Sequence, residues 1–268
     1  MKKFFFYAVL MVLLVQNLSA DSSQDVTEKF SSPFKIEEEY FLGKAVAVNL
    51  ISKYGLSTDK KANEYVSAVG NTVALASDQP STFHGYTFGI LNTDRVVSFA
   101  CPDGYVFISK GLIKMLNTED QLASVLACEI AHIVYNDPVF SVSRETVVKY
   151  NNLIKTSMNS DSNFNEDIKT MFALITEEII TNLEKGYDVD TNIRADNQAM
   201  IALKNSNYYP SEFYLALGQL YKNEDYVKSH PDQEKRTANL KDKIPKSSTA
   251  AGIALKNRTK RFNLYFSK

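Results

Sequence analysis

The spacing of apolar residues predicts helices on both sides of a short series of strands. Apolar positions recur with a helical period over long stretches of the chain. The expected helices span about residues 36–54, 62–74, 119–135, 142–184 (with a polar break at 159–165) and 192–204, and a further helix starts at 209–211. Shorter runs rich in β-branched and aromatic residues predict strands at about 86–91, 96–99 and 105–108, separated by turn residues.

The helix expected at 119–135 carries polar residues of chemical interest. Thr118 and Gln121 form a capping-box pattern at its start, and Pro138 follows its end. One apolar face of this helix is expected to be buried, made by Leu122, Val125, Leu126, Ile130 and Ile133. Glu129 and His132 lie on the neighbouring face, about one turn apart.

The first 20 residues have the pattern of an export signal. Two lysines precede an apolar run too short to span a bilayer, and a small residue, Ala20, ends the segment. We expect cleavage after Ala20, with an uncleaved N-terminal anchor as the alternative. Residues 21–33 are rich in Ser and Asp and are expected to be a flexible lead-in. The chain is therefore expected in the periplasm or cell envelope.

Composition excludes some classes of function. Removing the two lysines of the signal changes the net charge from −1 to −3 (−1 minus 2), so no nucleic-acid partner is expected. No other apolar run is long enough for a transmembrane helix. The two cysteines, Cys101 and Cys128, permit one disulfide in an oxidising compartment.

Residues 128–132, Cys-Glu-Ile-Ala-His, differ at one ligand from a zinc-protease motif. In the H-E-x-x-H pattern two histidines on one helix face bind Zn²⁺, and the glutamate is the general base. Glu129 and His132 keep these positions, while Cys128 replaces the first histidine.

The chain resembles metallopeptidase family forty-eight, the group of the HtpX heat-shock protease and the CaaX prenyl protease, over about residues 36–240. The similar blocks, in the family's order, are 99–108 (FACPDGYVFI), 111–113 (GLI), 122–134 (LASVLACEIAHIV), 194–196 (RAD), 207–210 (NYYP) and 230–236 (HPDQEKR). The resemblance implies a metallopeptidase-like domain at 34–240 and a basic C-terminal tail at 241–268. It also implies a zincin-like α+β fold, mainly helical, with a small sheet over the active-site helix.

In such a fold the edge strand of the sheet binds a peptide by β-augmentation. The edge residues implied here are Phe99, Ala100, Cys101, Gly104 and Tyr105.

The resemblance also implies roles for the site residues. Glu129 is the catalytic base, and the three zinc-ligand positions are Cys128, His132 and Asn192. Asn192 stands where the family has glutamate, and a neutral amide is a poor zinc ligand. Asp196 would orient a ligand, and Arg236 would pair with an acid near the site. His230 lies in a loop that some relatives bring near the metal.

Three hypotheses for Cys128 remain open. It forms a disulfide with Cys101, it binds zinc as a thiolate together with His132 and His230, or it is a buried free cysteine.

Two functions follow from these alternatives. In the first, zinc catalysis is impaired or lost, no cofactor is needed, and the protein binds peptides or unfolded envelope proteins along its edge strand. In the second, it is an active zinc endopeptidase of the envelope, in which Glu129 activates a water. The basic run 256–261 and the aromatic residues after it predict either a peripheral membrane contact or a segment packed on the domain.

Overall fold

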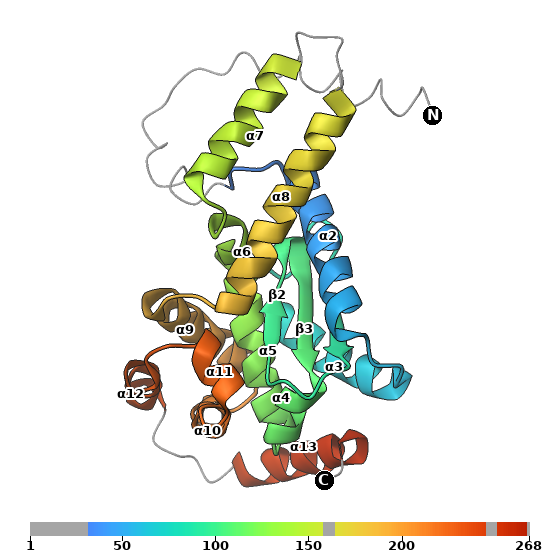
Figure 1. Ribbon diagram of the computed structural model, residues 1–268. Helices are drawn as coiled ribbons and strands as arrows, with labels where there is room; N and C mark the ends of the chain where they lie inside the picture. The colour runs from blue at the N-terminus through green and yellow to red at the C-terminus, as the bar shows by residue number, and fades with distance from the viewer. Residues whose placement is uncertain (1–31, 158–163, 245–250, 267–268) are drawn as a thin grey trace. The chain divides into compact units, whose positions relative to one another are not determined.

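The computed structural model describes residues 32–157, 164–244 and 251–266. The predicted signal peptide and nearly all of the predicted lead-in lie outside these residues. The elements, in chain order, are α2 (Ile36–Tyr54), α3 (Lys60–Ala74), β1 (Thr87–Leu91), β2 (Ser98–Ala100), the 3-10 helix η3 (Pro102–Gly104), β3 (Tyr105–Ser109), α4 (Lys110–Met115), α5 (Glu119–Val134), α6 (Asp137–Phe140), α7 (Arg144–Ser157), α8 (Phe164–Lys185), α9 (Val189–Asn205), α10 (Pro210–Leu220), α11 (Glu224–Ser229), α12 (Gln233–Lys243) and α13 (Ala251–Tyr265). The predicted α+β class, mainly helical with a small sheet, is confirmed (Figure 1).

The three strands form one mixed sheet in the order β1-β3-β2. Strand β1 is parallel to β3, and β2 is antiparallel to it, with Phe99 opposite Phe107. The prediction that Gly104 and Tyr105 belong to an edge strand is wrong. Tyr105 begins β3, which is hydrogen-bonded on both sides, and Gly104 lies in η3. The open edge is confined to β2.

The sheet separates two apolar cores, because successive strand side chains point to opposite faces. Ala100, Val106 and Ile108 pack into the core that contains α3, α5, α9 and α10. Phe99 and Phe107 pack into the core that contains α2 and α8. Helix α5 therefore lies under one face of the sheet, as the family resemblance implies, and α2 and α8 lie on the other (Figure 1).

The outer edge of β1 is already occupied. The Ile90 backbone N–H donates to Asn63 Oδ1 at 3.0 Å, and the Ile90 carbonyl accepts from the Ser57 backbone N–H at 2.7 Å. These contacts satisfy backbone groups that an edge strand would otherwise expose. In the described residues no further strand pairs with the outer edge of β2, although the Ala100 N–H on that edge donates to the Glu129 carboxylate.

Helix α5 is buried around its whole circumference, from Glu119 to Ile133. The sequence predicted burial of one face only. The difference arises because α3, α9, α10 and strand β2 all pack on this helix. The side chains of Ala123, Ala127 and Ala131 allow these close approaches. Glu129 and His132 consequently project into the interior rather than onto an open surface.

The basic C-terminal segment contains a helix, α13, docked on the start of α5. Arg258 Nε lies 2.6 Å from Asp120 Oδ2, and Arg261 Nε lies 2.5 Å from Glu119 Oε2. Both carboxylates are buried, and so is Phe262 of α13. This is the packed arrangement that the sequence offered as the alternative to a membrane contact. Over the parts of the chain that the structure describes, no helix combines the length and apolarity needed to cross a bilayer.

Candidate functional site

A cavity of about 130 Å³ lies where the last turns of α5 meet the outer edge of β2. Loops around residues 186–187 and 229–230 close its other side. The residues that bear on its chemistry are Arg95, Ser98, Phe99, Ala100, Glu129, His132, Tyr187, Asp225, Lys228 and His230. Five residues singled out from the sequence thus meet in one cavity, namely Phe99, Ala100, Glu129, His132 and His230.

Glu129 joins α5 to the edge strand. Its Oε1 accepts a hydrogen bond from Ser98 Oγ at 2.7 Å, and its side chain is buried. Burial raises the pKa of Glu129 above its usual range, although the charge of His132 and the bond from Ser98 act in the opposite direction. The acid therefore holds a proton more tightly than an exposed glutamate does, as a group suited to proton transfer would.

His132 is held in one orientation by a carboxylate. Its Nδ1 lies 2.8 Å from Asp137 Oδ2, and its ring stacks on Tyr187 with 4.5 Å between centroids. Since an ionised carboxylate can only accept, Nδ1 carries the hydrogen, and Nε2 is the other ring nitrogen available to the cavity. Arg194 pairs with the second oxygen of Asp137. The imidazole is thus oriented as a metal-binding or proton-transferring histidine would be.

His230 reaches the cavity from the end of α11. Its ring stacks on Tyr226 at 3.9 Å, and its Nδ1 is 2.9 Å from Ser229 Oγ. Burial, reinforced by the charge of Arg236, lowers the pKa of His230 well below its usual value. The ring is therefore neutral near pH 7.

Cys128 takes part in a different cluster, centred on a buried ion pair. Arg236 donates to both oxygens of Asp196, from Nε at 2.8 Å and from Nη2 at 2.6 Å, and both side chains are fully buried. The Cys128 thiol donates to Asp196 Oδ1 at 3.5 Å. Burial, with Asp196 adding to it, raises the pKa of Cys128 well above its usual value, so the sulfur keeps its proton.

Asn192 is buried in the first turn of α9. Its Nδ2 donates to the carbonyl oxygens of Tyr187 at 3.0 Å and of Asp188 at 2.9 Å. Its Oδ1 is buried and has no hydrogen-bond partner within the part of the chain that the structure describes. The residue is not part of the cavity wall.

The structure does not form the disulfide that was one of the three hypotheses for Cys128. Both cysteines are free and buried. Cys101 belongs to the core on the α2 side of the sheet, whereas Cys128 belongs to the core on the α5 side and points toward Asp196. Packing on opposite faces of the sheet is the physical reason for their separation.

Comparison with known proteins agrees with this architecture. The model of peptidase family M48 matches residues 60–244, which is more than half of the chain. The chain belongs to peptidase family M48. M48 members are generally zinc-dependent.

Partial similarity extends to curated M48 relatives. A Vibrio cholerae protein is 33% identical over 110 residues, which is 41% of this chain and 22% of that protein. The beta-barrel assembly-enhancing protease of Escherichia coli strain K12 is 30% identical over 116 residues, or 43% of this chain and 23% of that protein. The Yersinia pestis protein of the same name is 29% identical over 114 residues, or 42% and 23%. The matched part of the chain spans less than a quarter of these relatives.

The M48 ligand positions of this chain do not fit a zinc ion. Cys128 Sγ contacts Asp196, and the Asn192 amide is outside the cavity wall, which leaves His132 as the one ligand position that lines the cavity. In the described residues no group of three or more His, Cys, Asp or Glu side chains is arranged to hold a metal. Asp196, the expected orienting residue, contacts Cys128 at its ligand position and also pairs with Arg236.

Sequence reasoning missed several residues that shape this M48 cavity. Ser98 and Tyr187 have no motif of their own, and only the fold brings them to Glu129 and His132. Asp137 had a usable signal, because it follows His132 by five residues at the start of a Pro-containing turn. A carboxylate in that position is a natural partner for the imidazole.

Proposed function

We propose that this M48 protein has lost ordinary zinc-dependent proteolysis and binds extended peptide segments along the outer edge of β2. The observation that carries the proposal is the placement of that edge in the wall of the cavity, beside Glu129 and His132. An edge strand offers a row of backbone donors and acceptors to an incoming strand, and side-chain pockets beside it supply selectivity.

The register of the sheet identifies the groups that would meet the peptide. Backbone bonds join Val97 and Cys101 to β3, and strand groups alternate in direction. The N–H and C=O groups of Ser98 and Ala100 therefore point away from β3 and toward the cavity side, where the Ala100 N–H already donates to the Glu129 carboxylate. With the β1 edge occupied, β2 is the favoured place for strand addition.

Loss of zinc chemistry is supported by the two changed ligand positions. The Cys128 thiol, in contact with Asp196, and the Asn192 amide, whose oxygen has no hydrogen-bond partner among the described residues, stand at two of the family's three ligand positions. No cofactor is then required for peptide binding.

The proposed partner is an unfolded segment of an envelope protein. The curated relatives carry the name beta-barrel assembly-enhancing protease, and the first 20 residues of this chain have the pattern of an export signal. We therefore propose export to the periplasm or cell envelope, with no role for nucleic acid.

The decisive experiment alters one backbone group of β2. Ser98→Pro removes an N–H that points away from β3, so the ladder is kept while the open edge is blocked. Binding of fluorescein-labelled β-casein, measured by anisotropy, should weaken at least about 10-fold. Ser98→Ala is the matched control, because it removes the hydroxyl and keeps the N–H. Equal binding by Ser98→Pro and wild type, at unchanged thermal stability, would contradict the edge-strand proposal.

Zinc content and cleavage test the loss of catalysis separately. The purified protein should contain far less than one zinc per chain and leave β-casein intact. About one zinc per chain, with cleavage abolished in Glu129→Gln, would establish the alternative, an active zinc endopeptidase with a rebuilt site.

A further inference from the structure

The cavity beside β2 contains a hydroxyl group that lacks an acceptor. Tyr187 lines the cavity, and its Oη is buried without a hydrogen-bond partner in the described ranges. Burial, with the charges of Asp137 and Glu129 adding to it, raises the pKa of Tyr187 well above its usual value, so the phenol keeps its hydrogen. A buried donor without an acceptor is unfavourable, and a ligand that accepts this hydrogen bond would remove the penalty.

His230 supplies an acceptor to the same cavity. Its Nδ1 lies 3.2 Å from the Tyr226 carbonyl oxygen and 2.9 Å from Ser229 Oγ. A carbonyl oxygen can only accept, so Nδ1 carries the hydrogen of the neutral ring and Nε2 keeps its lone pair. Among the described residues, both hydrogen bonds of this ring go to Nδ1. Nε2 is therefore the acceptor that remains for a ligand.

Two loops in close contact carry this donor and this acceptor. Gly186, next to Tyr187, has a φ of 82°, and a Cβ there would overlap the carbonyl oxygen of Ser229, next to His230. A residue with a side chain would keep the loops apart. Aromatic stacking also holds both rings, with centroid distances of 4.5 Å for Tyr187 and 3.9 Å for His230. Both groups are thus held in place before a ligand binds, which reduces the entropy cost of binding.

A primary carboxamide is the side-chain group that matches this pair. Its oxygen can accept from Tyr187 Oη while its NH2 donates to His230 Nε2. A carboxylate has no hydrogen for His230, and an ammonium has no acceptor for Tyr187. A hydroxyl presents its donor and acceptor at one atom, whereas the two cavity groups come from different loops. An aliphatic side chain would leave both cavity groups unpaired.

A strand added at the outer edge of β2 would bring such a side chain to the cavity. Ser98 Oγ bonds to Glu129 of α5, whereas the next residue, Phe99, packs into the core on the α2 side. The side chains of an added strand would alternate in the same way, so every second one would point toward α5. A residue opposite Ser98 would therefore face the cavity.

We infer that the cavity is a carboxamide subsite, in which an Asn or Gln side chain of the bound segment lies between Tyr187 and His230. The inference rests on the proposed binding of a segment along β2, and it adds the class of side chain that such a segment carries. Segments with Asn or Gln at a position that faces α5 are then preferred over segments with a charged or aliphatic residue there.

Peptides that differ at one residue test the subsite in the full chain. Short fluorescein-labelled polythreonine peptides carry Gln, Glu, Lys, Leu or Thr at the centre, and binding is measured by anisotropy. The Gln peptide should bind at least about 10-fold more tightly than the others. Tyr187→Phe keeps the ring and removes the hydroxyl, and it should lower the affinity for the Gln peptide to that for the Leu peptide.

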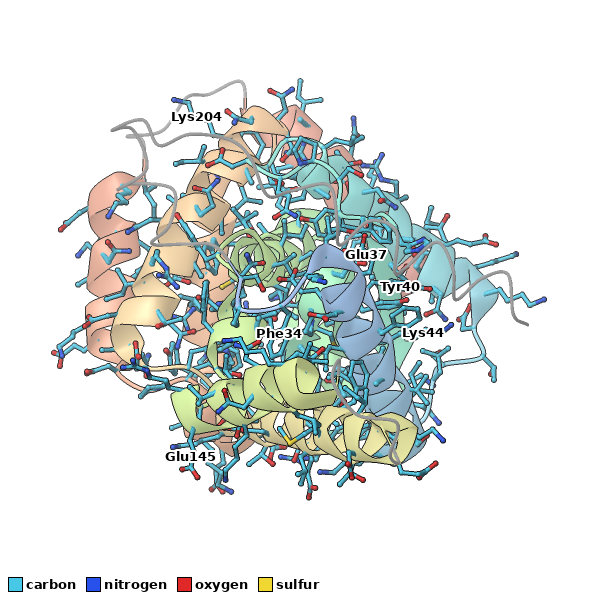
Figure 2. All side chains as sticks on the ribbon, turned by 90° about the horizontal axis from the view of Figure 1, so that it is seen from above. Phe34, Glu37, Tyr40, Lys44, Glu145 and Lys204 are labelled. Atoms are coloured by element: carbon cyan, nitrogen blue, oxygen red, sulfur yellow. The ribbon has the colours of Figure 1, made fainter. Side chains whose placement is uncertain are left out.

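Tyr40→Phe is the matched control, because it removes a tyrosine hydroxyl that does not line the cavity. Figure 2 shows Tyr40 and Lys44 on the side of α2 opposite Phe34. This variant should keep the wild-type preference for Gln. A preference that Tyr187→Phe retains, or that Tyr40→Phe loses equally at unchanged melting temperature, would overturn the inference.

The subsite and the strand proposal can fail separately. If all peptides bind with equal affinity and Ser98→Pro weakens each of them, the carboxamide subsite is overturned and strand binding stands. If no peptide binds, the strand proposal fails, and propionamide alone then tests the cavity by saturation-transfer NMR. Propionamide bound by wild type but not by Tyr187→Phe would support the subsite, and propionamide bound by neither would overturn it.

Discussion

Replacing Arg236 by methionine should destabilise the protein severely, although Arg236 does not line the cavity. Arg236 makes two short hydrogen bonds to Asp196, and neither side chain has any exposed surface. Methionine keeps most of the buried volume, so the main effect is a carboxylate left buried with only the Cys128 thiol as a donor. Breaking a buried ion pair by removing one partner costs about 3–5 kcal/mol.

The loss in the free energy of unfolding can be measured by urea and thermal denaturation. For a domain of this size each kcal/mol lowers the melting temperature by about 2–4 °C, so a fall of about 6–20 °C is expected. Lys114→Met is the matched control, because Lys114 forms an equally short pair with Asp94 that is exposed on both sides. This control should lose less than about 1 kcal/mol.

The double variant Arg236→Met with Asp196→Asn should recover part of the loss, because no buried charge then lacks a partner. If Arg236→Met lowers the free energy of unfolding no more than Lys114→Met does, the buried pair does not stabilise the protein as predicted.

Three further predictions concern the site and its support. Cys128→His combined with Asn192→Glu should raise zinc content toward one per chain by mass spectrometry, while either change alone should not. Because burial raises the folded-state pKa of Glu129, the free energy of unfolding should fall as pH rises above 4.5 through that raised pKa, and Glu129→Gln should show a smaller fall over the same pH range in urea titrations. Arg258→Ala should cost about 1–3 kcal/mol in thermal melts, since it leaves the buried Asp120 short of a charged partner; an unchanged melting temperature would show that α13 is not held through this pair.

The sequence predicted where the helices and strands lie along the chain. It did not predict how far each is buried or which strand is central in the sheet. The apolar spacing located the three strands and the long helices, because period and turn residues are local properties. It did not reveal that α5 is buried on all sides, since burial depends on how many neighbours pack on a helix. It also assigned Gly104 and Tyr105 to an edge, although pairing of β1 with β3 makes β3 the central strand.

The sequence predicted only part of the candidate site, because a local pattern identifies residues but not their neighbours in space. Glu129 and His132 belong to a local motif, and His230 was included through the family resemblance. Ser98 and Tyr187 were missed, because they carry no pattern and reach the cavity only through sheet register and a loop. The disulfide between Cys101 and Cys128 followed from a count of cysteines, and a count cannot tell which face of a sheet each one occupies.

By itself the sequence determined the M48 family and the helical and strand segments, and it predicted that two zinc-ligand positions are substituted. Only the tertiary structure decided what the substituted residues do. Cys128 is a donor to Asp196 because the fold buries its thiol beside this carboxylate, which also pairs with Arg236. Pairings of this kind join residues from distant parts of the chain, and their energies depend on burial and distance, which no local pattern of residues specifies.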